Sequence, residues 1–199
     1  MDISPTMITV FIIVLLIISV ITIYNQIVSL KESVKRGWAN VITQERQKGK
    51  ILPELLKLVD QYTGYEGEVL TAVTELRGQA SKLQNDSQQL RGDSIDVNSA
   101  KQFDDNVKAF LGGLNFVAEA YPDLKANDTF KKAMHEVTKQ EENVGAAIRI
   151  FNSNVEEFNA FIGMFPMNLV NGFLNKEQAL NIFEDSTAAS AFEYKPNFK

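Results

Sequence analysis

The sequence predicts an all-α protein: a single N-terminal transmembrane helix that continues into an antiparallel up-down helical bundle with long helices. Three observations support this prediction. Residues 3–30 contain no charged side chain. Through most of the remaining chain, apolar residues recur at alternating steps of three and four, which is the period of helices packed nearly parallel to one another. Polar segments and prolines separate these periodic stretches, as expected between helices.

The uncharged stretch predicts a membrane anchor. About 20 apolar residues rising ~1.5 Å each match a hydrocarbon core ~30 Å thick, and there a helix satisfies its own backbone polar groups. A signal peptide would have a basic segment before the apolar run and a small-residue cleavage site after it, and neither is present. A core helix would have a polar face. Residues that represent this anchor are Met7, Phe11, Leu15, Ile18 and Ile23.

Basic residues beside the anchor predict its orientation. No Lys or Arg precedes the apolar run, whereas the residues after it include Lys31, Lys35, Arg36, Arg46, Lys48 and Lys50. Loops rich in Lys and Arg stay in the cytoplasm. We therefore expect a single-pass protein of the cell inner (plasma) membrane, with its N-terminus outside, the bulk of the chain cytoplasmic, and membrane lipid as a partner.

Composition limits the function. We expect three regions: an anchor over 1–30, a cytoplasmic helical bundle over 31–185, and an aromatic-containing C-terminal tail over 186–199. The chain has no cysteine, so disulfides and thiolate chemistry are excluded. Its net charge of −5 argues against a nucleic-acid partner, which needs a basic surface. We expect no catalytic residues, cofactor or metal.

The first half of the bundle is expected to contain a stalk and one long helix. An apolar row after the anchor predicts the stalk: Ile27, Leu30, Val34, Trp38 and Val41. Gly49 and Pro53 then indicate a break, with Pro53 in the first turn of the next helix, where its missing N–H is harmless. From Leu52 a heptad pattern runs to Leu90, and residues 91–99 are expected to form a polar loop.

Two further long helices are expected in the second half. One carries Phe103 and Phe110 on its apolar face and ends at Tyr121-Pro122, because the residue before proline disfavours helical backbone. The other starts at a cap residue, Asn127 or Asp128, and has an apolar seam from Phe130 to Phe165. After Pro166, residues 175–178 resemble the start of a short helix.

Two carboxylates interrupt the apolar seams. Glu66 and Glu141 occupy seam positions, and Arg77 and Arg149 adjoin such positions. A buried carboxylate needs a partner, so we expect these four residues either to form a buried polar layer that sets the helix register or to lie at a partly solvated edge. The alternative is a carboxylate pair that binds a metal or ligand. Ferritin-like metal sites use Glu-x-x-His pairs, and His135, the single histidine, has no such glutamate.

Two apolar segments have no obvious cover in the predicted bundle. They are the stalk row Ile27, Leu30, Val34 and Trp38, and the tail residues Phe192, Tyr194 and Phe198. Exposed apolar patches usually mark interfaces, so we expect a homo-oligomer that associates through both. The alternative is that helices of the same chain cover the stalk and that the tail folds back.

Five stretches of this sequence resemble the LemA family of bacterial membrane-anchored proteins. They are Tyr24-Asn25 with Val28, Ile51-Leu52-Pro53 leading into Tyr62, residues 119–127 (Glu-Ala-Tyr-Pro-Asp-Leu-Lys-Ala-Asn), Phe151-Asn152 with Asn159, and Phe165-Pro166-x-Asn168. The resemblance covers nearly the whole chain, and residues 121–127 are the most specific part. It implies a membrane helix followed by an antiparallel bundle whose bulk is cytoplasmic.

The chain departs from the family pattern at three places. The family usually has a His-Glu pair where this chain has Tyr65-Glu66, and an Arg-Arg-x-Asp leader where residues 47–50 read Gln-Lys-Gly-Lys. It also has an arginine near position 148, which is Ile148 here. Some relatives help to build magnetosome membranes, so the resemblance favours a role in membrane organisation. We expect a non-enzymatic scaffold that self-associates and organises proteins or membrane at the cytoplasmic surface. The alternatives are a small-ligand or metal sensor that uses the bundle carboxylates, and an adaptor that regulates a membrane protease or kinase.

Overall fold

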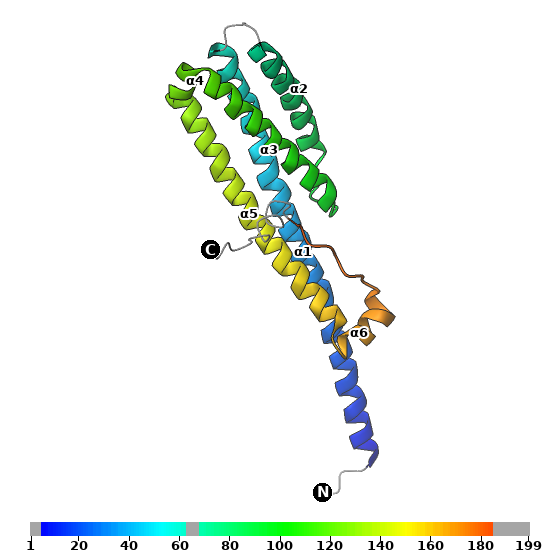
Figure 1. Cartoon of the computed structure of the whole chain (residues 1–199). Helices are drawn as coiled ribbons and strands as arrows, with labels where there is room; N and C mark the ends of the chain where they lie inside the picture. Colours follow the sequence, from blue (N-terminus) through cyan, green and yellow to red (C-terminus); the bar gives the residue numbers. More distant parts are fainter. Residues whose placement is uncertain (1–4, 63–67, 185–199) are drawn as a thin grey trace, which may run out of the picture.

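The four long helices of the described residues run up, down, up and down along one rod (Figure 1). The computed structural model describes residues 5–62 and 68–184. The elements are α1 (Pro5–Tyr62), α2 (Glu68–Gln89), α3 (Val97–Ala120), α4 (Pro122–Ala126), α5 (Asp128–Gly163), α6 (Met167–Val170) and the π-helical turn η1 (Asn171–Asn175). No strand occurs in these two described ranges. The predicted all-α class is confirmed.

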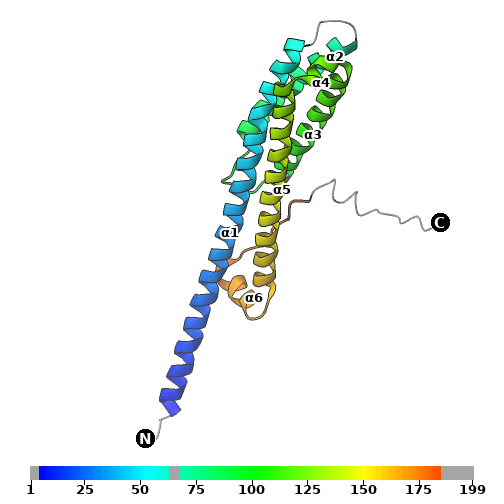
Figure 2. The same ribbon diagram turned by 90° about the vertical axis from the view of Figure 1, so that its left-hand side faces the viewer.

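Helix α1 has an exposed part and a packed part. Its N-terminal part extends beyond the bundle with no other helix beside it (Figure 2). An 18-residue window of this helix has a mean hydropathy of 3.0 and no buried residue, so by length and composition α1 can cross a membrane. From Ile27 onward α1 is buried mainly against α5, and also against α2 and α3.

The predicted break at Gly49 and Pro53 is wrong, because α1 continues through both residues to Tyr62. A Cβ on Gly49 would lie 3.1 Å from the Ser87 Cβ and 3.2 Å from the Phe103 ring. Gly49 therefore allows α2 and α3 to approach α1 closely. Pro53 removes one backbone hydrogen bond, but the fully buried side chains of Leu52 and Leu55 on either side hold the helix in place.

The single long helix expected from Leu52 to Leu90 is also wrong. Its first part is the end of α1, and its second part is α2, which runs in the opposite direction. The later seams are confirmed from α2 onward. Buried seam residues are Val73, Leu76, Ala80 and Leu83 on α2, Leu90 directly after it, Phe103, Val107, Phe110, Leu114 and Val117 on α3, and Phe130, Val137, Val144, Phe151, Val155, Phe158 and Ile162 on α5.

Local signals place the end of α3 and the start of α5. Tyr121 is the C-cap of α3, and Pro122 begins the short helix α4, which the sequence did not predict. Leu124 of α4 is fully buried. The Asn127 Oδ1 atom accepts a hydrogen bond of 2.9 Å from the Phe130 N–H, so Asn127 is the predicted cap of α5.

The short helix expected after Asn175 is wrong, because residues 176–184 contain no helix and lie along α5. Two asparagines of α5 hold this segment by its backbone. The Asn159 side chain exchanges two hydrogen bonds of 2.9 Å with the N–H and C=O of Leu180. The Asn152 side chain does the same with Phe183, at 2.8 and 2.9 Å. Phe165, expected at the end of the α5 seam, is instead exposed.

We call residues 176–184 the strap. The spacing of the two asparagines explains why the strap is extended. Asn152 and Asn159 are seven residues apart on α5, which corresponds to about 10 Å along a helix. Phe183 and Leu180 are three residues apart, which corresponds to about 10 Å in extended chain. The helix and the strap therefore match in length, and the strap runs antiparallel to α5.

Candidate functional site: a polar cleft between α2 and α3

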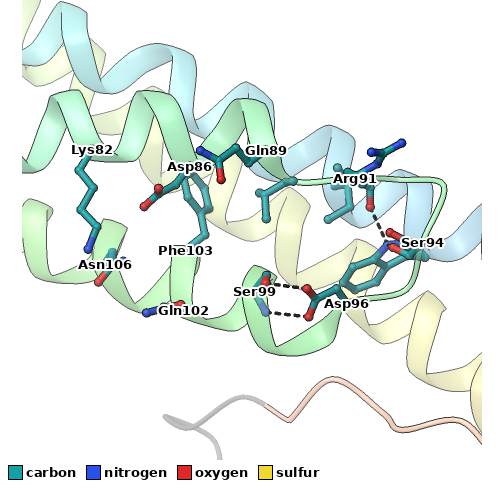
Figure 3. A pocket seen from close by; sticks show the side chains of 13 residues that line it. Lys82, Asp86, Gln89, Arg91, Ser94, Asp96, Ser99, Gln102, Phe103 and Asn106 are labelled. Atoms are coloured by element: carbon teal, nitrogen blue, oxygen red, sulfur yellow. Dashed lines mark hydrogen bonds between the residues drawn. The ribbon is translucent and has the colours of Figure 1, made fainter.

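A polar cleft opens between the end of α2 and the start of α3 (Figure 3). Its volume is about 290 Å³. Trp38 and Ile42 of α1 line it together with Phe103 of α3. The remaining lining residues are Lys82, Asp86, Gln89 and Leu90 of α2 and its end, Arg91, Ser94 and Asp96 of the connecting loop, and Ser99, Gln102 and Asn106 of α3.

Trp38 fixes the loop that closes one end of the cleft. Its indole Nε1–H donates to the carbonyl of Arg91 at 3.0 Å and to the carbonyl of Ser94 at 2.6 Å. On its other side the indole packs against the Phe151 ring, with centroids 5.3 Å apart and planes inclined by 55°. One side chain of α1 therefore joins the cleft to the α1–α5 core.

Charged groups complete the ends of the two helices beside the cleft. The Arg46 guanidinium donates to the Leu90 carbonyl at the C-terminus of α2, where a cation is favourable. Asp96 caps α3 by accepting hydrogen bonds from the Ser99 N–H at 3.1 Å and the Ser99 hydroxyl at 2.6 Å. These hydrogen bonds from Ser99 lower the pKa of Asp96.

Most polar side chains in the cleft are available to a ligand. No hydrogen bond or ion pair joins the side chains of Lys82, Gln102 or Asn106 to another described residue. In Figure 3 the Lys82 side chain of α2 points toward Asn106 of α3. Of the charged lining residues, Arg91 pairs with Asp93 at 2.7 and 3.0 Å and Asp96 accepts hydrogen bonds from Ser99, so one cation, Lys82, and one carboxylate, Asp86, remain. This balanced set of donors and acceptors suits a neutral polar group such as a peptide backbone better than a phosphate.

A buried ion cluster links α1 to α3. Glu45 and Lys48 of α1 are both fully buried. The Lys48 Nζ lies 2.5 Å from Asp104 Oδ1 and 3.1 Å from Glu45 Oε2, and Lys108 Nζ lies 2.9 Å from Asp104 Oδ2. Neither carboxylate oxygen of Glu45 has a hydrogen bond of good geometry. Asp104 is therefore the main partner of both lysines, and Glu45 is the least satisfied member.

Burial and the neighbouring Asp104 raise the pKa of Glu45 from 4.5 to about 7, although Lys48 opposes the change. Burial would lower the pKa of Lys48, but the carboxylates of Glu45 and Asp104 outweigh burial and raise it. Lys48 is therefore charged at neutral pH, while the raised pKa of Glu45 brings the titration of its carboxyl into the neutral range.

The four residues expected to form a polar layer do not come together in the described part of the chain. Arg77 pairs instead with Asp60, with Nη2 and Nε at 2.7 and 3.2 Å from Oδ1, and both side chains are partly exposed. Glu141 is partly exposed and Arg149 is exposed, whereas Glu66 lies outside the described residues. Glu141 therefore lies at a partly solvated edge of its seam, and no buried layer forms around it and Arg149.

The stalk row is not an uncovered surface. Ile27, Leu30, Val34 and Trp38 are all buried within the chain, because α5 covers the stalk along this length. The expectation that this row is exposed for self-association is therefore wrong, and the part of the alternative in which helices of the same chain cover the stalk is correct. The tail residues Phe192, Tyr194 and Phe198 lie outside the described residues.

Sequence reasoning missed the buried ion cluster although the pattern contained a signal for it. Continued by steps of three and four, the stalk row passes from Val41 through Glu45 and Lys48 to Leu52. The expected break at Gly49 stopped the row too early, and Lys48 was assigned to the basic flank. Two opposite charges one turn apart on an apolar seam indicate a buried pair.

The sequence also matches known proteins. The model of the LemA family matches residues 37–196. The chain belongs to the LemA family. It is 25% identical over 146 residues to Protein LemA of Metamycoplasma hominis, a match that covers 73% of this chain and 62% of that relative. The chain thus spans about three fifths of the length of this LemA relative.

The structure assigns local roles to the LemA-like stretches of the sequence. Tyr121 and Pro122 separate α3 from α4, and Leu124 fills the core. Asn152 and Asn159 hold the extended strap. These roles are structural: they shape the bundle and attach the C-terminal segment to it.

Proposed function

We propose that this LemA-family protein is a non-enzymatic, membrane-anchored scaffold that holds a protein-binding cleft at a set height above the cytoplasmic face of the inner membrane. One observation carries the proposal: α1 contains both the apolar anchor and a row of core residues of the bundle. Anchor and bundle therefore form one body with no linker between them, which suits a protein that positions a partner.

The helix geometry gives the height of the cleft. Trp38 is fifteen residues beyond Ile23, the last residue of the apolar run, so it stands about 22 Å farther along the helix. This distance takes the cleft past the lipid headgroups, which occupy only the outer part of a bilayer ~40–45 Å thick. A soluble segment of another protein can reach the cleft there.

The chemistry of the cleft suggests what it holds. Unpaired amides on Gln102 and Asn106 offer both donors and acceptors, and Phe103 provides an apolar surface. We infer a polar segment of a partner protein, such as a subunit of another membrane assembly. The described residues include no group of three or more His, Asp or Glu side chains placed to hold a metal ion.

Photocrosslinking in native membranes tests this proposal. We would replace Gln102 with p-benzoylphenylalanine in the full chain, and Lys139, an exposed residue of α5, as the control. We expect a discrete crosslinked product from position 102 and none from position 139, and Lys82→Glu should reduce that product. The absence of any product at position 102, or equal products at both positions, would contradict a protein-binding cleft.

A small-ligand sensor is the second candidate. The cleft volume of about 290 Å³ is close to the lower end of the range for small-molecule sites. Native mass spectrometry of the purified full chain would separate the two functions. A stoichiometric small mass that Asn106→Leu removes would favour the sensor over the scaffold.

Self-association remains part of the proposal, now through the tail alone. Phe192, Tyr194 and Phe198 give the tail an aromatic character, and confinement to a membrane raises the effective concentration, so that weak contacts suffice. Mass photometry in nanodiscs should show oligomers for the full chain and monomers after truncation at Asp185. A monomeric full chain would remove self-association from the proposal.

A further inference from the structure

We infer that the turn after α5, residues 164–175, is a second membrane contact that inserts into the lipid interface beside the α1 anchor. This inference rests on the proposed anchoring of α1 and goes beyond it. The turn contains α6 and η1, and in Figures 1 and 2 it lies beside α1 just above the part that extends alone.

The turn exposes large apolar side chains at one end of the bundle. Phe165 and Phe173 are 78% and 79% exposed, and Met164, Leu169 and Leu174 are each more than half exposed. No other described segment covers these five side chains. Large exposed apolar side chains gathered in one short segment mark a contact with a membrane or another protein.

Helix register places this patch at the edge of the hydrocarbon. The Asn154 side chain donates to the Ser33 carbonyl at 3.1 Å, which brings these two residues of the antiparallel helices to one level. Gly163 is nine residues beyond Asn154 toward the anchor, and Tyr24 is nine residues before Ser33 in the same direction. Because both helices rise about 1.5 Å per residue, the turn begins beside the end of the apolar run.

The positions of the charged residues also place the turn beside the end of the apolar run of α1. Residues 3–30 and residues 158–175 contain no charged side chain. Charges resume at Lys31 on α1 and at Lys176 after η1. The Lys31 ammonium and the Glu177 carboxylate pair at 2.6 Å, so the two uncharged zones end side by side. If the bilayer surface lies at this ion pair, Lys31, Lys176 and Glu177 are in water, and the exposed apolar side chains of the turn are in lipid.

The turn is held in this position by its own hydrogen bonds. Asn171 is buried, and its side chain exchanges two hydrogen bonds of 3.0 Å with the backbone of Glu177. Asn159 then fixes Leu180 against α5. The apolar side chains therefore stay outward while the backbone is fixed, as in an interfacial element whose apolar face enters lipid by about 5–10 Å.

Depth-dependent fluorescence quenching tests the inference on the full chain in nanodiscs. The chain has no cysteine, so Phe173→Cys or Phe165→Cys gives a single site for an environment-sensitive dye. Lipids with a nitroxide near the headgroup are the quencher for positions 165 and 173, and lipids with a nitroxide at the end of an acyl chain are the quencher for position 11 at the bilayer centre. Phe11→Cys in the anchor is the positive control. Phe116→Cys, also exposed but on α3, is the negative control.

We expect probes at 165 and 173 to emit at shorter wavelengths than the probe at 116 and to lose most of their emission to nitroxide lipids. Emission at 173 equal to that at 116, with the probe at 11 quenched, would overturn the inference and leave the anchor intact. A blue-shifted but unquenched probe at 173 would also overturn it, because protein rather than lipid would cover the patch. A probe at 11 that is not quenched would instead refute the anchoring of α1.

Discussion

Glu45→Gln should stabilise the protein at neutral and higher pH. Glu45 is fully buried, and its pKa is raised to about 7. Below about pH 4.5 the carboxyl is protonated in both folded and unfolded chains. Between about pH 4.5 and 7 only the unfolded chain ionises, so the folded state loses stability as pH rises, and the full cost is present above about pH 7. Glutamine is neutral at every pH and removes this cost.

The magnitude follows from the change in pKa. Raising the pKa of Glu45 from 4.5 to about 7 corresponds to ~3 kcal/mol at most. Lys48 keeps its 2.5 Å contact with Asp104 in the variant, so no lysine is left unpaired. We therefore expect Glu45→Gln to raise the free energy of unfolding by up to ~3 kcal/mol near pH 8, and by little below about pH 5.

Thermal and urea unfolding of the full chain in detergent, followed by circular dichroism over this pH range, measures the effect. Glu54→Gln is the matched control, because Glu54 is an exposed residue of the same helix. The comparison is the difference between variant and wild type at each pH, which cancels the titration of all other groups. A difference that does not change with pH would refute the argument that Glu45 ionises at the expense of the fold.

Three further predictions concern the core, the strap and the topology. Phe151→Ala should lower the free energy of unfolding by ~3–5 kcal/mol by leaving a cavity, whereas Ile150→Ala, at an exposed neighbour, should change it little; equal effects in denaturant melts would remove Phe151 from the core. Asn159→Leu removes both hydrogen bonds to Leu180, so hydrogen exchange at the Leu180 amide should accelerate, and unchanged protection would contradict the strap. A phosphatase fused after Lys199 should be inactive, because we expect this end in the cytoplasm; an active fusion would reverse the topology.

Apolar periodicity predicted the helices wherever a helix has one buried face. The seams of α3 and α5 follow steps of three and four, and most of their members are buried as expected, with Phe165 and Glu141 among the exceptions. Asn127 and Tyr121-Pro122 then placed the ends of these helices, because a cap and a proline act on their own neighbours. In such segments local chemistry and tertiary packing favour the same structure.

The helices in the first half of the chain were harder to predict, because residues that usually signal a turn or a helix end have a packing role here. Gly49 is a turn signal by composition, but here its missing side chain lets Ser87 and Phe103 come close. A proline in a helix interior usually kinks or breaks the helix. At Pro53 the buried side chains of Leu52 and Leu55 keep α1 continuous. Tertiary packing overrode both local signals.

The cleft and the strap could not be derived from periodicity. Trp38 appeared in the sequence as one more apolar seam residue, and its hydrogen bonds to Arg91 and Ser94 depend on where the loop lies. Asn152 and Asn159 hold backbone atoms, and backbone contacts leave no pattern in the sequence of the strap. Charges on a seam were the one available clue to Glu45 and Lys48.

Because α1 is continuous, the far end of the bundle also moves with the apolar segment of the same helix. From Tyr24 to Tyr62 the helix extends about 57 Å beyond the apolar run. Transmembrane helices adjust their tilt to bilayer thickness, with tilts of about 20° being common. A change of about 10° at the anchor would move the far end of the rod sideways by about 10 Å. Small differences in membrane thickness would thus become displacements as wide as a helix at the end of the rod.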